Sequence, residues 1–286
     1  QTQPASMPND PNLMSDTQNN HQNQQPKPSH TGSNFHEVQL KKIRKIINAR
    51  NEQRQTALHL AAFGGHVEVV RSIAATGLAD PSVQDIRQET PLHLSAEAGS
   101  AETTEILLQA GALPFLIDLK GKTAVEVAAR GNFVTLVDMI IKAERVHKKL
   151  VETNQDVKII QNIYFGTDTN VGTEHLRSIL FKLSTKKFKK GDWNILAKYW
   201  NYSETQIRCI EEQFIHKKGY KEHGYRFLLI WLFEKTFSFA SFKIKGHCLE
   251  QSFYQVEDLE KYVAPVNDAW GKNPKNEVLA LLSLEI

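Results

Sequence analysis

Three stretches of the chain carry nearly the same seven residues: TALHLAA at 56–62, TPLHLSA at 90–96 and TAVEVAA at 123–129. Their first residues are 34 and then 33 positions apart (56 to 90, 90 to 123). Self-similarity at such a period indicates stacked copies of one supersecondary unit, because a unit of this size buries its apolar face against its neighbours. The sequence therefore predicts a repeat array.

Each copy has the features of the start of a short helix. The Thr that opens it is a good N-cap, since its hydroxyl accepts a hydrogen bond from an unpaired backbone N–H. Pro91 falls at the first helical position, where its missing N–H costs nothing. A second helical stretch follows each copy: HVEVVRSIAATG, SAETTEILLQAG and NFVTLVDMIIKA. Each unit is therefore expected to be a pair of helices.

Turn residues recur at fixed offsets in the three units. An Asn or Asp (Asn51, Asp85, Asp118) lies five residues before each Thr and suits a tight turn, in which Gly121 takes the position of Arg54 and Gln88. A Gly after each first helix suits the left-handed conformation that ends a helix, and the third unit is one residue shorter up to this Gly. The residues predicted to define the repeats are Thr56, His59, Gly65, Asp85, Thr90, His93, Gly99, Gly111, Asp118, Gly121, Thr123 and Gly131.

This pattern resembles the ankyrin repeat. The TPLH-type stretches, the step AAFGG and the QAGA at 109–112 carry the resemblance, which spans about 51–145. It implies a β-turn and two antiparallel helices per repeat, stacked in a curved array. The amphipathic stretch at 35–48 is interpreted as the second helix of a degenerate leading repeat that caps the array. We therefore expect three repeats plus a half-repeat cap over residues 35–150.

His59 and His93 occupy the same place in the first two units, and Glu126 replaces them in the third. No carboxylate or cysteine lies at metal-ligand spacing from either histidine. We interpret each imidazole as a structural group that bonds turn backbone in its own repeat or in the next one.

Residues 174–263 have the pattern of a second helical block. DWNILAKYW at 192–200 has an apolar face, SETQIRCIEEQF at 203–214 opens with a capping box, and HGYRFLLIWLF at 223–233 is apolar enough to be central. Further helices are expected at about 174–184, 241–252 and 255–263, which makes a six-helix bundle. Its predicted core residues are Trp193, Leu196, Ala197, Ile207, Ile210, Leu228 and Trp231.

This second block resembles the death domain, through WNILA, IRCIEE and LLIW. With the array, it is similar to the ankyrin repeat and death domain-containing proteins. The expected fold is all-α: an ankyrin αα solenoid followed by a six-helix bundle. The remaining segments are predicted to be a disordered polar tail at 1–34, a helical extension and linker at 151–173, and a C-terminal tail at 264–286.

The composition favours an intracellular protein without catalytic chemistry. Cys209 and Cys248 have neither disulfide nor metal-site spacing, and no uncharged apolar run reaches the roughly 18–20 residues of a membrane span. No signal peptide opens the chain, and because it begins with Gln1 we expect a fragment or a processed product. Phosphate-loop, dinucleotide, metalloprotease, hydrolase and kinase motifs are all missing. We expect no enzyme, no cofactor and no metal, and a cytoplasmic location with nuclear access left open.

One lysine-rich run, KLSTKKFKKGDW at 182–193, has five lysines before its first acidic residue, Asp192. It reads as a solvated loop, as a contact patch for an acidic protein surface, or as a nucleic-acid patch. The net charge of +3 does not by itself imply nucleic acid. The resemblance to death domains implies pairing of charged helix faces, with an acidic patch to complement the lysines. The candidate partner contacts are Lys186, Lys187, Lys189, Lys190, Glu211 and Glu212.

These observations predict a protein-protein interaction adaptor in intracellular signalling. The array would hold one protein partner on its concave face, and the bundle would make homotypic contacts, including self-association. Two alternatives stay open: a substrate-recognition subunit of a ubiquitin-ligase-type complex, and a transcriptional regulator that uses the basic run at 182–190.

Overall fold

The computed structural model describes residues 31–155, 180–213 and 219–243, together with residues 160, 163, 165, 177 and 178. Side chains are described for these residues except 31–36, 187 and 235–243. Within them, all regular secondary structure is helical, apart from one isolated β-bridge between Ile117 and Thr123. The chain divides after Lys41 into two units, and each is treated by itself.

The first helix, α1 (Thr31–Ile47), begins earlier than residue 35, where the sequence placed its start. An ion pair between Lys41 and Glu37 supports it at 2.9 Å. Directly after α1, the Asn48 side chain donates to the Leu78 carbonyl and accepts from the backbone N–H of Asp80, both at 2.9 Å. These bonds tie the exit of α1 to the loop after the first repeat. The capping role of α1 stays a prediction.

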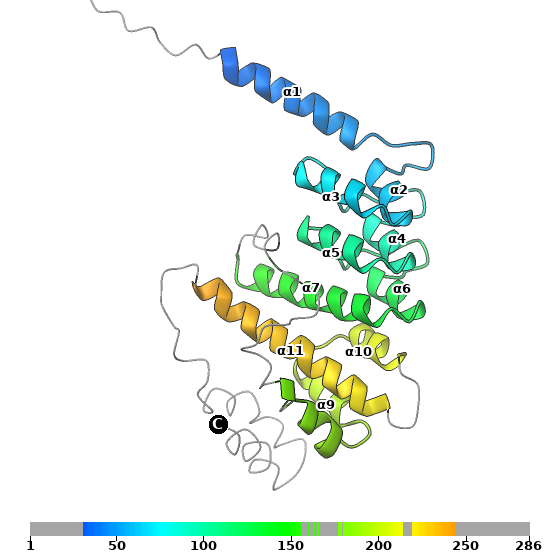
Figure 1. Cartoon of the computed structure of the whole chain (residues 1–286), viewed down its shortest axis with the longest axis vertical. Coiled ribbons are helices and arrows are strands. Elements are labelled where there is room, and N and C mark those ends of the chain that lie inside the picture. Colours follow the sequence, from blue (N-terminus) through cyan, green and yellow to red (C-terminus); the bar gives the residue numbers. More distant parts are fainter. Residues whose placement is uncertain are drawn as a thin grey trace, which may run out of the picture. The chain divides into compact units, whose positions relative to one another are not determined.

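Three helix pairs follow, as the repeated motif predicts (Figure 1). The first helices of the pairs pack on one another in one layer, and the second helices pack in another. The pairs are α2 (Ala57–Phe63) with α3 (Val67–Ala75), α4 (Pro91–Glu97) with α5 (Ala101–Gln109), and α6 (Ala124–Arg130) with α7 (Val134–Glu152). The apolar positions of all six helices contribute to one core.

The third unit differs from its prediction in one turn. Gly65 and Gly99 adopt the left-handed conformation, with φ of 66° and 69°, but Gly131 is right-handed at −74°. Asn132 takes the left-handed position instead, with φ of 57°. Asn tolerates this conformation better than most residues, and Asn132 lies nine residues after Thr123, the same offset as Gly99 from Thr90. The third unit is therefore not shortened, and the predicted role of Gly131 was wrong.

The second block contains the short π-helix η2 (Leu183–Lys187) and the helices α9 (Asp192–Tyr199), α10 (Glu204–Glu211) and α11 (Gly219–Lys243). The predicted capping box is present, since Ser203 accepts from the Gln206 N–H and Gln206 accepts from the Ser203 N–H, both at 3.1 Å. The seven residues predicted for the bundle core are all buried: Trp193, Leu196, Ala197, Ile207, Ile210, Leu228 and Trp231.

Helix α11 corrects the predicted division of this block. From the sequence, one helix was expected to end at residue 233 and the next to begin at 241, but α11 runs unbroken to Lys243. No Gly or Pro lies between Tyr225 and Lys243, so nothing in the chain ends the helix there. The rest of the expected fifth helix, the sixth helix, the linker at 166–173 and the tail at 264–286 lie outside the described residues.

The second block packs directly on the last repeat. Helix α10 contacts α6 and α7, and α11 contacts α7 along its length (Figure 1). Phe165 is also buried, and its carbonyl accepts a bond of 3.1 Å from the Lys142 ammonium group of α7. The array and the block therefore belong to one compact unit, residues 42–286. Among the helices described, none combines the length and apolar character that a bilayer crossing requires.

Candidate protein-binding surface

The two motif histidines connect neighbouring repeats. The backbone N–H of Thr56 donates to Nδ1 of His59 at 3.1 Å, and Nε2 of His59 lies 3.2 Å from the Glu89 carbonyl of the next repeat. Because Nδ1 accepts, the proton must sit on Nε2, which donates to that carbonyl. His93 repeats both contacts, with Thr90 at 3.2 Å and with the Lys122 carbonyl at 3.1 Å.

These contacts make the histidines neutral structural groups. Burial lowers the pKa of both His59 and His93, because the charged imidazolium is poorly solvated inside the stack. The searched part of the chain holds no group of His, Cys, Asp and Glu residues suited to a metal ion. Neither histidine is a candidate for chemistry in this arrangement.

Glu126 shows how the last repeat differs from the first two. One carboxylate oxygen accepts the Thr123 N–H at 3.1 Å, as Nδ1 does in the histidine repeats. The other accepts from Lys122 at 3.1 Å and from Arg208 of α10 at 2.5 Å. In the first two repeats the histidine donates to the turn of the following repeat, whereas the second block follows the third repeat and presents the cation of Arg208. The departure from the motif therefore matches what stacks on the third repeat.

Largely buried ion pairs connect the second block to α7. Arg226 of α11 is 5% exposed and donates to both carboxylate oxygens of Asp138, from Nη2 to Oδ1 at 2.5 Å and from Nε to Oδ2 at 3.2 Å. Arg145 of α7 pairs with Glu234 of α11 at 2.6 Å. Breaking such a pair by removing one partner costs about 3–5 kcal/mol, because an uncompensated charge is left inside. The block is therefore held on the array by specific charge pairing as well as by apolar packing.

Glu144 adds a titratable group to the contact region between α7 and the second block, which we call the junction. Its carboxylate accepts a bond of 2.7 Å from the Gln206 side chain of α10. Burial raises the pKa of Glu144 to about 7, with a further contribution from nearby Glu126. The junction therefore contains a carboxyl group that changes charge near neutral pH.

The turn tips form the outer edge of the array. Asp85 and Asp118 are buried, and each carboxylate accepts two backbone N–H groups of its own turn at 2.8–2.9 Å. The residue after each aspartate is apolar and exposed: Ile86 at 57% and Leu119 at 63%. Backbone bonds join successive tips, since Leu119 N donates to the Arg87 carbonyl at 2.9 Å.

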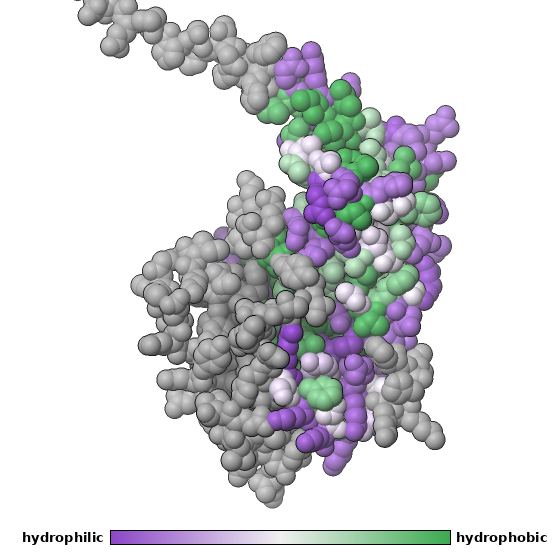
Figure 2. All heavy atoms as spheres, in the orientation of Figure 1, coloured by the Kyte–Doolittle hydropathy of each residue, from purple (hydrophilic) through white to green (hydrophobic). Residues whose placement is uncertain are grey.

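The tips are also basic. Arg87 is 58% exposed although it pairs with Glu89 at 2.7 Å, and Arg54 and Lys120 are exposed at the neighbouring tips. Figure 2 shows hydrophilic and hydrophobic residues interleaved on the side of the array where α2, α4 and α6 lie. Exposed apolar side chains beside cations, on a rigid and repeated frame, suit contact with a partner of complementary charge. We call Arg54, Ile86, Arg87, Leu119 and Lys120 the tip surface.

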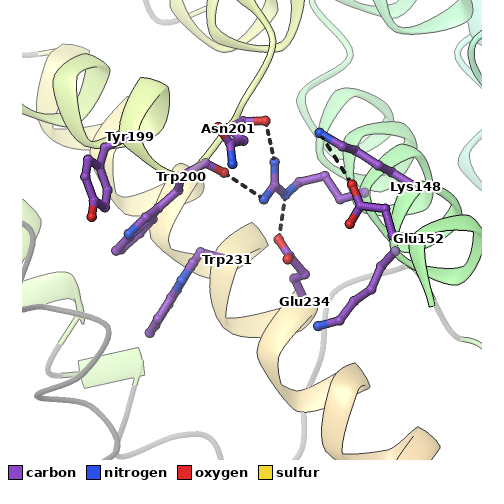
Figure 3. Close-up of a pocket in the computed structure, with 9 residues that line it drawn as sticks. Lys148, Glu152, Tyr199, Trp200, Asn201, Trp231 and Glu234 are labelled. Carbon is purple, nitrogen blue, oxygen red and sulfur yellow. Dashed lines mark hydrogen bonds and ion pairs between the residues drawn. The ribbon is translucent and has the colours of Figure 1, made fainter.

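A cavity of about 290 Å³ opens where α7 meets the second block (Figure 3). Arg145 is one of its lining residues and donates to the carbonyls of Trp200 and Asn201 at 3.1 and 3.4 Å, besides its pair with Glu234. Stacked aromatic rings form one wall, with Trp200 and Trp231 at 4.9 Å between centroids. The other lining residues are Lys148, Lys149, Glu152 and Tyr199.

The predicted contacts of the second block lie at its surface. Lys186, Lys189 and Lys190 are exposed around the end of η2, while the Lys187 side chain is outside the described set. Glu211 and Glu212 are exposed on α10, where Glu211 accepts from Asn194 and Glu212 lies 3.7 Å from Arg208. Their role in partner binding stays a prediction. Cys209 is buried, and burial raises the pKa of its thiol to about 12, which fits an inert packing role.

Stacked helix pairs, histidines that hydrogen-bond to the next repeat, and exposed turn tips define an ankyrin-repeat array. The family model for ankyrin repeats (3 copies) matches residues 30–114 and 73–152, so the chain contains ankyrin repeats. This match begins upstream of the first hairpin and ends with α7. It does not reach residues 174–263, whose resemblance to the death domain therefore stays a prediction.

Curated relatives are similar to between a third and a half of the chain. NF-kappa-B inhibitor alpha of Homo sapiens is 28% identical over 109 residues, which are 36% of this chain and 34% of the relative. A transient receptor potential cation channel subfamily A member 1 homolog of Caenorhabditis elegans is 29% identical over 135 residues, 46% of this chain and 11% of the channel. The NF-kappa-B p105 subunit of Gallus gallus is 32% identical over 101 residues, 34% of this chain and 10% of the relative. The chain thus spans about a third or less of these relatives.

Sequence reasoning did not identify the junction residues. No motif surrounds the four residues of the two ion pairs, Asp138, Arg145, Arg226 and Glu234. The members of each pair lie 88 or 89 positions apart in the chain. The one available signal was Glu126 in place of the motif histidine. It indicated that the third repeat meets something other than a fourth repeat.

Proposed function

We propose that this protein is a non-enzymatic interaction adaptor in cytoplasmic signalling, whose array binds a protein partner through the tip surface. The observation that carries the proposal is the pair of exposed apolar tips, Ile86 and Leu119, each followed by a cation. Two of the relatives, an NF-kappa-B inhibitor and an NF-kappa-B subunit, carry names from signalling.

The partner should present acidic and apolar side chains to the tips. Opposite charge would guide association, and burial of Ile86 and Leu119 would supply affinity. The adaptor role also requires a second contact. Exposed side chains of both charges, Lys186, Lys189 and Lys190 with Glu211, suit the homotypic pairing expected of a death-like bundle.

The experiment compares three forms of the full chain: wild type, Ile86→Asp/Leu119→Asp and the surface control Lys45→Glu, at an exposed lysine of α1. Proteins captured by each form are identified, and each candidate partner is purified and measured by calorimetry. We expect the tip variant to lose at least about tenfold in affinity for a direct partner, because two apolar contacts become charged. The control should retain that binding.

A tip variant that kept every partner at wild-type affinity would contradict the proposed site. Circular dichroism and thermal melting should accompany the measurement, to show that the variant array is intact. Neither the substrate-receptor nor the transcriptional alternative gains support from the residues that the structure describes.

A further inference from the structure

The first repeat exposes a face that the second and third repeats bury. Leu60 of α2 is 53% exposed, whereas its equivalents one and two repeats on, Leu94 and Val127, are 1% and 7% exposed. The second helices show the same contrast, because Val69 of α3 is 48% exposed while Thr103 of α5 is fully buried. Position explains this difference: α2 packs on α4 and α4 packs on α6, but the structure describes no helix pair ahead of α2.

A backbone carbonyl on the same side of the first repeat has an open acceptor position. The carbonyls of Glu89 and Lys122 each accept from the N–H of their own turn and also from the histidine of the preceding repeat, at 3.2 and 3.1 Å. The equivalent carbonyl of Gln55 accepts the Asn51 N–H of its own turn at 3.0 Å and nothing else within the described part of the chain. The place of a histidine donor is therefore free at Gln55.

A backbone N–H of the first tip is open as well. In the second and third repeats, the N–H groups of Ile86 and Leu119 donate to the carbonyls of the preceding tips, at 3.0 and 2.9 Å. The equivalent N–H of Glu52 has no acceptor among the residues that the structure describes. We call the side chains of Leu60 and Val69, the Gln55 carbonyl and the Glu52 N–H the end face.

Two sources of a covering layer can be set aside. A first helix one repeat upstream of α2 would fall on NQQPKPS at 23–29, and this stretch has no aliphatic or aromatic residue to bury. A second copy of the chain cannot stack head to tail on the end face, because α10 and α11 already pack on its third repeat. The covering layer therefore has to come from another protein.

We propose that the end face binds the uncovered last repeat of an ankyrin-type partner protein. The last helix pair of the partner packs on Leu60 and Val69, as α2 and α3 pack on α4 and α5 in this chain. A histidine of that repeat donates to the Gln55 carbonyl, and a turn carbonyl accepts the Glu52 N–H. The inference is carried by continuity with the contacts between successive repeats, in which each repeat buries its neighbour. It goes beyond the proposed tip site and does not depend on it.

The test uses the full chain and a designed array of consensus ankyrin repeats. The first repeat of this probe is polar on its outer side and its last repeat is uncapped, so that the probe cannot stack on itself. The comparison array differs only in a polar last repeat. Affinity is measured by calorimetry, and hydrogen exchange at the Glu52 N–H reports whether that group gains an acceptor in the complex.

The variants of the full chain are Leu60→Asp, Val69→Asp, the tip variant Ile86→Asp/Leu119→Asp and Val151→Asp. Val151 is 63% exposed and lies on α7 of the third repeat, so its substitution is a matched control for the change from an exposed aliphatic residue to a charge. Thermal melting accompanies each measurement.

We expect saturable binding of the uncapped array, with a Kd below about 100 µM. Leu60→Asp and Val69→Asp should each weaken binding at least about tenfold, because a charge would replace an apolar contact that the complex buries. The tip variant and Val151→Asp should bind as the wild type does, and the comparison array should not bind. Hydrogen exchange at the Glu52 N–H should slow at least about tenfold in the complex.

Several results would overturn the inference. These are absence of saturation at about 200 µM probe, equal binding of the comparison array, or equal losses in Leu60→Asp and Val151→Asp. Unchanged exchange at Glu52 in a complex that Leu60→Asp weakens would mean that the occupant does not stack as a repeat does. Self-association of the wild type that Leu60→Asp abolishes would assign the face to a second copy. A melting temperature of Leu60→Asp more than about 5 °C below that of the wild type would show that another segment of the chain already covers the face.

Discussion

Restoring the repeat motif in the third unit, by Glu126→His, should destabilise this protein. An imidazole can keep the bond from the Thr123 N–H, as His59 and His93 do in their repeats. It cannot replace the oxygen that accepts from Lys122 and Arg208. The substitution would also place a donor nitrogen opposite the Arg208 guanidinium.

The cost follows from the exposure of the two partners. Glu126 is 12% exposed, and Arg208 is 52% exposed. Hydrogen bonds to charged groups contribute about 1.5–3 kcal/mol when buried, but solvent screens a half-exposed arginine. We therefore expect a loss of about 1–2 kcal/mol in the free energy of unfolding, less than for a fully buried pair.

The pKa of Glu126 gives the same loss a pH dependence. Burial alone would raise this pKa, but the Thr123 N–H, Lys122 and Arg208 together lower it below 4.5, the ordinary pKa of a glutamate side chain. A lowered carboxyl pKa contributes stability that is present above the unfolded pKa and is lost as the pH falls through the folded value. The stability that the Glu126 carboxylate contributes should therefore be full at pH 7 and shrink in acid.

The assay is urea unfolding of four proteins at pH 7: wild type, Glu126→His, Arg208→Ala and the double variant. If Glu126 acts through Arg208, the histidine substitution should cost less than about 0.5 kcal/mol in the Arg208→Ala background. An equal cost in both backgrounds would refute the reasoning, because the effect would then arise inside the repeat.

Two further predictions concern the junction and the repeat turns. Burial raises the pKa of Glu144 from 4.5 to about 7, so the free energy of unfolding of the wild type should fall by at most about 3 kcal/mol as the pH rises from 4.5 to 7. Glu144→Gln should keep the bond to Gln206 and remove this pH dependence, which urea unfolding at several pH values would measure. An unchanged pH dependence in the variant would show that Glu144 is not its source. Gly99→Ala should lower the free energy of unfolding by about 1–3 kcal/mol, because Gly99 has φ of 69° and a Cβ there would meet the Phe133 ring; a thermal melt equal to that of the wild type would contradict this.

Most of the array could be predicted from local sequence. The Thr caps, Pro91 and the turn aspartates act over a few residues, and the repeated period shows that the units stack. Asn132 was missed because glycine was assumed at every left-handed position, although asparagine is also tolerated there.

The junction could not be predicted in the same way. Its contacts join residues more than 50 positions apart, such as Arg226 with Asp138, and a single charged residue carries no sign of its distant partner. Helix α11 was divided wrongly because residues 234–240 were left between two expected helices, although Lys243 is reached without a helix breaker. The tip surface was expected only in general terms, because the exposure of Ile86 and Leu119 depends on the frame that presents them.

The pairing of the third repeat with the second block limits where the array can grow. A repeat duplicated after α7 would separate Asp138 and Arg145 from their partners on α11. A repeat inserted between α5 and α6 would meet a histidine that bonds to its turn on one side and a matching turn on the other, and it would leave the ion pairs between α7 and α11 intact. Lineages or designs that lengthen this protein should therefore add repeats upstream of the third unit, which must remain last.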